Sequence, residues 1–90
     1  MKLILTILSD NDSDPVSQAL ITSGFRVTRI ASTGGFFRRG SSTLMIGVAD
    51  DKVNDAIGVI RKSVSPAPVP ETGASRATLF VVNVENFTQI

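Results

Sequence analysis

Residues 25–48 read FRVTRIASTGGFFRRGSSTLMIGV, which is two runs of strand composition joined by a glycine-containing segment. The two runs, 25–30 and 44–48, are dominated by β-branched and other apolar side chains, which is typical of strands. The segment between them combines adjacent glycines with two phenylalanines, two arginines and several hydroxyl side chains. We therefore expect two strands joined by a glycine-rich loop over residues 34–42.

The composition of this loop favours ligand binding. Glycines let backbone amides approach a ligand closely, phenylalanines offer apolar faces to a flat ring, and arginine, serine and threonine can hold phosphate or sugar oxygens. Together these groups are typical of a nucleotide site. The same residues also suit a solvated connection whose Phe36 and Phe37 pack into a core, and composition alone leaves both interpretations open.

Strand and helix signals precede the hairpin. Residues 2–8 are rich in leucine and isoleucine and predict a strand that ends at a polar run. Asp14 is a suitable N-cap, Pro15 suits the first helical position, and Gly24 can end the helix. The sequence therefore predicts a helix over residues 14–23.

A second helix and a last strand are predicted after the hairpin. Asp50 or Asp51 is expected to cap this helix. Its apolar residues recur at helical spacing and share one face: Val53, Ala56, Ile57 and Ile60. Residues 63–76 contain three of the four prolines and predict a loop, and residues 77–84 predict a strand.

The predicted order of elements is βαββαβ, which indicates one α+β domain over residues 1–90 with a ferredoxin-like sandwich fold. Both helices of this fold cover one face of the sheet, so the other face should be polar in a monomer. The strands are instead apolar on both faces: Leu3, Leu5 and Ile7 alternate with Ile4, Thr6 and Leu8, and Leu44, Ile46 and Val48 alternate with Thr43, Met45 and Gly47. We expect a homo-oligomer packed through its sheets, although central strands are also apolar in many monomers.

The overall composition excludes several classes of function. Nine Lys and Arg balance eight Asp and Glu, so the chain has no global basic field for duplex DNA or an anionic membrane. There is no Cys and no His, which removes the thiol nucleophile, the commonest general base and the commonest metal ligands. We expect no catalysis, no metal and no cofactor. The apolar start over residues 1–8 is too short for a signal peptide or a membrane span, so we expect a cytoplasmic protein.

Specific residues along the chain resemble the PII-like cyclic di-AMP receptor family of bacteria. They are Thr28, Ala31, Thr33-Gly34-Gly35-Phe36, Gly40, Thr43, Gly47 and Asp51, followed by Phe80-Val81 and Phe87-Thr88-Gln89. The resemblance extends over the chain except the proline-rich loop. It implies a homotrimer of ferredoxin-like subunits that binds one cyclic di-AMP in each of three clefts between neighbouring subunits.

The resemblance also implies which residues contact the ligand. They are Arg26, Thr28, Gly35, Phe36, Phe37, Ser41, Gly47, Phe80 and Gln89. Arg26 and Thr28 would contact a phosphate or adenine, and Gly47 would allow close approach of the ligand. Phe80 would line the cleft, and Gln89 would reach a base from the C-terminal tail.

The role of the glycine-rich loop is likewise implied by the resemblance. Gly35 and Phe36 would supply backbone and an aromatic wall, and Phe37 stands where the family usually has an aliphatic residue. Ser41 stands where the family's ligand-binding sequences usually carry an asparagine that hydrogen-bonds adenine. A serine cannot make the two-pronged contact of an amide. The loop over 63–76 is also shorter than the large loop common in the family.

The sequence therefore predicts a non-catalytic signalling protein that binds a cyclic dinucleotide and acts on an unidentified downstream protein. Two alternatives remain. One is a PII-like protein that binds another adenine nucleotide. The other is a structural or RNA-interacting oligomer, because the same order of elements occurs in RNA-recognition domains, although the aromatics of those domains lie on central strands.

Overall fold

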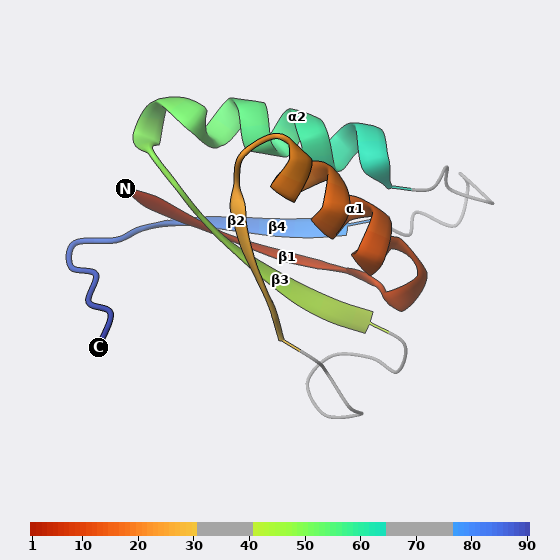
Figure 1. The fold of residues 1–90 in the computed structure, drawn as a ribbon, viewed down its shortest axis with the longest axis horizontal. Helices are drawn as coiled ribbons and strands as arrows, with labels where there is room; N and C mark the ends of the chain where they lie inside the picture. The colour runs from red at the N-terminus through yellow and green to blue at the C-terminus, as the bar shows by residue number, and fades with distance from the viewer. Residues whose placement is uncertain (31–40, 65–76) are drawn as a thin grey trace.

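The computed structural model describes residues 1–30, 41–64 and 77–90, which form a four-stranded antiparallel sheet with two helices against one face (Figure 1). The elements are β1 (Lys2–Ser9), α1 (Asp10–Thr22), β2 (Arg26–Ile30), β3 (Ser41–Val48), the short 3₁₀ turn η1 (Asp50–Lys52), α2 (Val53–Ser63) and β4 (Ala77–Asn83). The strand order is β2-β3-β1-β4. This arrangement is compatible with the predicted ferredoxin-like α+β fold.

The hydrophobic core lies between the sheet and the helices. Alternate residues of a strand point to opposite faces, so the core takes every second residue of the central strands. The buried strand residues are Ile4, Thr6 and Leu8 of β1 and Ser42, Leu44, Ile46 and Val48 of β3. The helices contribute Val16 and Leu20 from α1 and Ala56 and Ile60 from α2. This face is thus buried along the central strands, while Val81, opposite Ile4 on the β4 edge, is 43% exposed.

The start of α1 differs from the prediction. The helix begins at Asp10 and not after Asp14, and the Oγ atom of Ser9 caps it by accepting a hydrogen bond from the amide of Asp12 at 3.3 Å. The serine cap satisfies a free amide, and carboxylates in the first turn are favourable at the positive end of the helix dipole. Pro15 consequently lies inside the helix and not at its first position.

The end of α1 confirms the prediction that Gly24 ends the helix. Gly24 has φ 93°, a conformation that glycine adopts without the steric cost of a side chain. Its amide donates to the carbonyl of Ile21 at 3.0 Å, and the amide of Phe25 donates to the carbonyl of Leu20 at 2.9 Å. This pair of bonds is a Schellman motif, and it turns the chain directly into β2.

The start of α2 also differs from the prediction. Neither Asp50 nor Asp51 caps the helix, because both lie in η1 and no side chain caps either this turn or α2. The Asp50 carboxylate instead lies 2.8 Å from the N-terminal ammonium of Met1, whose hydrogen bond and charge lower the pKa of Asp50. The apolar face of α2 is confirmed, with two residues buried and the other two, Val53 and Ile57, packed against the core.

The loop boundaries are partly corrected. β3 begins at Ser41, so the last two residues of the predicted glycine-rich loop belong to the strand. The hydroxyl of Ser42 is buried and donates a hydrogen bond to the carboxylate of Asp10, which ties β3 to the first turn of α1. Ser63 is likewise the last residue of α2 and not the first of a loop. Residues 31–40 and 65–76 lie outside the described residues.

Candidate functional site

The second face of the sheet has no helix against it among the residues described. Residues directly opposite one another on neighbouring strands share a face, so the register identifies this surface, which we call the open face. It consists of three rows across the sheet: Arg26, Gly47, Leu3 and Val82; Thr28, Met45, Leu5 and Phe80; Ile30, Thr43, Ile7 and Thr78. Most of these side chains are apolar.

Much of this apolar surface is accessible in the isolated subunit. Ile30, Phe80 and Val82 are 43%, 51% and 43% exposed. Leu5 and Met45, in the centre of the open face, are only half-buried. The open face is thus an extended apolar surface that one subunit leaves accessible to solvent.

Three of the predicted ligand residues gather at one corner of the open face. Arg26 lies directly opposite Gly47, and Thr28 lies two residues further along β2, opposite Met45. Both β2 side chains are exposed. A cation, a hydroxyl group and a glycine backbone therefore lie within about 8 Å of one another along two paired strands. We call Arg26, Thr28 and Gly47 the corner cluster.

Gly47 leaves little room for a side chain. A Cβ atom at this position would lie 2.8 Å from the Cε methyl of Met1. The obstacle is the far end of a flexible side chain, which can move. The Met1 side chain therefore lies over Gly47, and a ligand would reach this backbone only where the methionine moves aside.

Phe80 lies on the opposite edge of the same face. It shares a row with Thr28, but β3 and β1 lie between them. Three strand spacings correspond to about 14 Å. Within one subunit, the structure does not bring Phe80 to the corner cluster.

The remaining predicted residues are spread more widely. Ser41 lies at the other end of β3, six residues from Gly47 and therefore about 20 Å away. Gln89 lies in the exposed tail that follows β4. Gly35, Phe36 and Phe37 lie outside the described residues.

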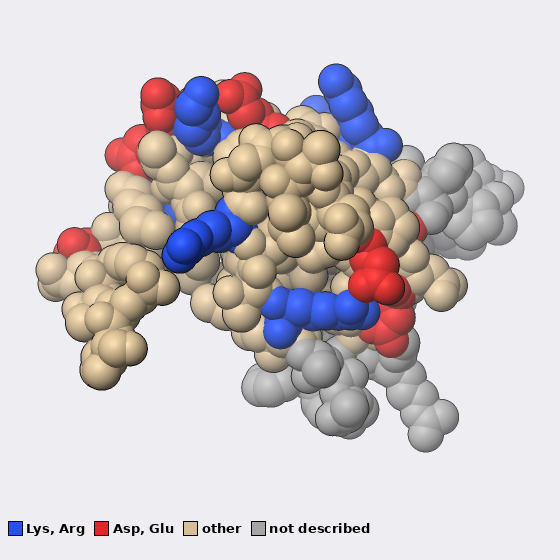
Figure 2. Space-filling model, viewed as in Figure 1, with Lys and Arg blue, Asp and Glu red and all other residues tan. Residues whose placement is uncertain are grey.

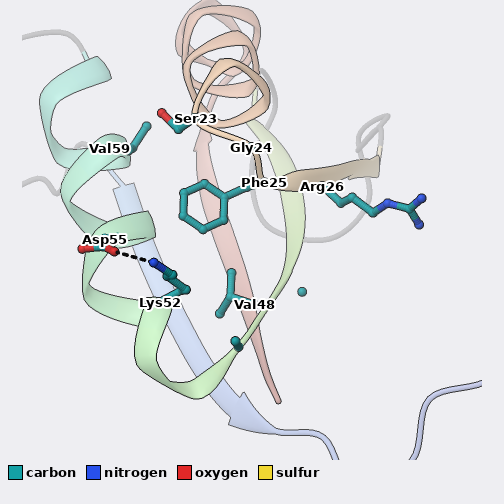
Figure 3. A pocket seen from close by; sticks show the side chains of 10 residues that line it. Ser23, Gly24, Phe25, Arg26, Val48, Lys52, Asp55 and Val59 are labelled. Carbon is teal, nitrogen blue, oxygen red and sulfur yellow. Dashed lines mark ion pairs between the residues drawn. The ribbon is translucent and has the colours of Figure 1, made fainter.

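A groove of about 430 Å³ opens beside the corner cluster, and we call it the corner groove (Figure 3). It lies where the end of α1, the adjoining ends of β2 and β3, and the start of α2 meet. Its lining residues are Ser23, Gly24, Phe25, Arg26, Gly47, Val48, Ala49, Lys52, Asp55 and Val59. Its volume is within the range of small-molecule and side-chain pockets.

The corner groove has an apolar part and a charged part. The ring of Phe25 points toward α2, whereas Arg26 points away from it, toward the open face (Figure 3). The Nζ atom of Lys52 lies 3.9 Å from the Asp55 carboxylate, and both side chains are more than half exposed. Sequence reasoning missed Phe25 and Lys52 as site residues, because they are 27 positions apart and are brought together by the turn at Gly24 and the pairing of β2 with β3.

Charge is distributed without a dominant patch on the face viewed in Figure 2, where basic and acidic side chains are interspersed. One such pair joins β2 to α1: the Nη1 atom of Arg29 donates to the Asp14 carboxylate at 2.7 Å. Arg29 thus differs from Arg26, which points to the open face. In residues 1–30, 41–64 and 77–90, no helix is long and apolar enough to cross a membrane.

Comparison with known proteins identifies the family. The chain is similar to a functionally unknown protein from Pediococcus pentosaceus ATCC 25745 whose crystal structure has been determined. The two share 28% identity over 99% of this chain and 96% of that one, with a TM-score of 0.77. A model of the cyclic-di-AMP receptor family matches residues 1–66, which include β1 to α2 and the corner cluster. The chain therefore belongs to the cyclic-di-AMP receptor family.

Proposed function

We propose that this protein is a non-catalytic signalling protein of the cytoplasm that binds cyclic di-AMP in clefts between the subunits of a homotrimer and acts on a downstream protein. The observation that supports this most strongly is the corner cluster. In a chain of the cyclic-di-AMP receptor family, it combines a cation, a hydroxyl group and a glycine on the face of the sheet that carries no helix among the residues described.

The chemistry of the cluster suits a cyclic dinucleotide. The guanidinium of Arg26 can make charge-assisted hydrogen bonds to a phosphodiester, and the hydroxyl of Thr28 can donate to a phosphate oxygen or accept from an adenine amino group. Gly47 has no side chain, so a ribose or base can approach β3 once the flexible Met1 side chain moves aside. Phe80 can stack on a base, and such contacts contribute about 1–3 kcal/mol per base.

The position of Phe80 favours a cleft between subunits. About 14 Å separates it from Thr28 within one sheet, because the two residues lie on the β4 and β2 edges. If the β4 edge of one subunit lies against the β2 edge of the next, Phe80 comes within about 5 Å of the neighbouring strand. Contacts between two different edges can close into a ring, and a ring of three contains three equivalent clefts.

The open face supports the assembly itself. It presents apolar side chains from all four strands, and soluble monomers seldom expose contiguous apolar patches above a few hundred Å². The β4 edge has the sequence ATLFVVN, without charge or proline, so nothing in it opposes pairing with another strand. Packing three open faces around a common axis would remove the open face of each subunit from solvent. Contact with a neighbouring strand would cover the β4 edge.

Binding without turnover follows from the residues available. General acid–base catalysis needs a side chain that titrates near neutral pH beside the reacting bond. The corner cluster contains arginine, threonine and glycine, and the chain has no histidine or cysteine. We therefore expect the ligand to be bound and released unchanged.

Isothermal titration tests this function. Purified protein is titrated with cyclic di-AMP, cyclic di-GMP, ATP and AMP, and recovered ligand is checked for hydrolysis. We expect saturable binding of cyclic di-AMP at one ligand per subunit, with intact ligand recovered. Preference for ATP or AMP would instead establish binding of another adenine nucleotide, and no binding to any of the four would refute the nucleotide site.

A further inference from the structure

The C-terminal tail extends away from the body of the subunit and carries an exposed aromatic side chain, Phe87. The amide of Val84 donates to the carbonyl of Met1 at 3.0 Å, and residues 85–90 beyond it are all exposed. Phe87 is 63% exposed. Figure 1 shows this segment extending away from the sheet. An aromatic side chain held in water at the end of a short arm gains stability from any apolar pocket within reach.

The corner groove is such a pocket, and it lies at the same end of the sheet. Asn83, the last residue of β4, is opposite Lys2, and Lys2 is opposite Val48, which lines the groove. The groove offers the ring of Phe25 together with Val48 and Val59, an apolar surface suited to a second aromatic ring.

Distance favours the groove of the neighbouring subunit. Phe87 is three residues beyond Val84, which gives it a reach of about 10 Å. Within its own subunit, the nearest strand that lines the groove is β3, which carries Val48 two strand spacings from β4, or about 10 Å away, at the limit of this reach. Across a contact between the β4 edge and a neighbour's β2 edge, the β2 strand that borders the neighbour's groove is one spacing away, or about 5 Å. The neighbour's groove is thus the nearer of the two.

Charge complementarity favours docking of the tail into a corner groove. The tail carries one charged side chain, Glu85, two residues before Phe87. The groove carries Lys52, which is 57% exposed and only loosely paired with Asp55 at 3.9 Å. A tail entering with Phe87 innermost brings its carboxylate to the side of the groove that holds this ammonium group.

We propose that the C-terminal tail of each subunit docks into the corner groove of its neighbour, with Phe87 as the anchor. The inference rests on the trimer of the proposed function. It also deepens that function, because Arg26 lines the same groove and Gln89 is only two residues beyond Phe87. Docking therefore delivers the tail's amide side chain to the neighbour's corner cluster.

Cross-linking between chains tests the proposal cleanly, because the natural chain contains no cysteine. One variant carries Ser23→Cys at the exposed rim of the groove, and a second, affinity-tagged variant carries Asn86→Cys in the tail. The two are co-expressed, and mixed trimers are treated with a short bismaleimide. We expect a covalent heterodimer. Adding Phe87→Ala to the tail variant should reduce its yield by about tenfold or more, since burial of an aromatic side chain corresponds to at least that factor.

Matched controls separate docking from chance encounters and from assembly. Gln18→Cys, on the exposed side of α1, replaces the groove variant as a measure of background, and light scattering reports the trimer independently. A trimer whose Ser23→Cys and Asn86→Cys chains cross-link no better than this background would overturn the proposal. So would a link formed only within a chain that carries both cysteines, or a monomeric protein. Cyclic di-AMP titration of the natural chain then shows whether the proposed function fails as well.

Discussion

The two faces of the sheet are similar in sequence but different in environment. On the helix-covered face, Ile4, Leu44 and Ile46 are fully buried, whereas on the open face Leu5 and Met45, also in the two central strands, are only half-buried. Only the open face carries Arg26 and Thr28. The comparison teaches that similar apolar patterns can have different roles: one face forms the core of the subunit, and the other remains accessible and is the face on which we propose assembly and ligand binding.

The largest difference between the faces is expected for a buried charge. Ile46→Lys places an ammonium group in the helix-covered core, where an unpaired charge costs several kcal/mol, comparable to the stability of a whole domain. We expect an unfolded chain, measured as loss of the far-ultraviolet circular dichroism of the natural protein. A folded variant with native thermal stability would contradict the assignment of this face to the core.

The same charge on the open face should act on assembly instead. Leu5→Lys leaves the helix-covered core intact but would put three charges into the centre of the proposed trimer. We expect native circular dichroism with a monomer mass by light scattering at micromolar concentration. A Leu5→Lys variant that remains trimeric would show that the open face is not the surface of assembly.

Two arginines of one strand provide the next comparison. Arg26→Ala removes a charge-assisted hydrogen bond of about 1.5–3 kcal/mol, so cyclic di-AMP should bind roughly 10- to 100-fold more weakly by titration. Arg29→Ala is the matched control, because Arg29 points to the other face and pairs with Asp14. It should leave affinity unchanged and lower stability by no more than about 1 kcal/mol. Equal losses of affinity in the two variants would remove the corner cluster as the site.

The smallest expected effect concerns a polar atom on the helix-covered face. The hydroxyl of Thr6 is buried and has no hydrogen-bond partner in the described part of the chain. Thr6→Val keeps the shape and removes an unsatisfied group, so the free energy of unfolding should rise by about 1 kcal/mol. Chemical denaturation measures this free energy of unfolding. The affinity for cyclic di-AMP should not change. A loss of stability would mean that this hydroxyl has a partner in solution.

Much of the fold could be predicted from the sequence because local signals and packing agree. Gly24 ends α1 as expected, since only the left-handed conformation closes the Schellman motif before β2. The alternation in β1 and β3 predicted two apolar faces, but not which of them the helices cover. The helix starts were predicted wrongly because the expected acidic caps have other partners: Asp14 pairs with Arg29, and Asp50 with the terminal ammonium. Ser9 caps α1 instead, and no side chain caps α2.

The site was less predictable than the fold. Arg26, Thr28 and Gly47 were named from the family resemblance, and pairing between β2 and β3 brings them together. The resemblance did not indicate that Phe80 lies on the β4 edge of the sheet, opposite the β2 edge that carries Arg26 and Thr28. A linear motif does not contain the order of the strands. The corner groove was missed for the same reason: it depends on the meeting of three elements that are distant in the chain.

The central claim is that one cleft combines Arg26 of one subunit with Phe80 of its neighbour, and mixed trimers test it most directly. Arg26→Ala and Phe80→Ala variants are prepared separately, shown to be trimeric and weak in binding, then mixed, dissociated and reassembled. If the site is shared between subunits, random assembly restores both side chains in about a quarter of the clefts, and titration should recover that fraction of tight cyclic di-AMP binding. Mixed trimers that bind no better than either variant alone would contradict the account.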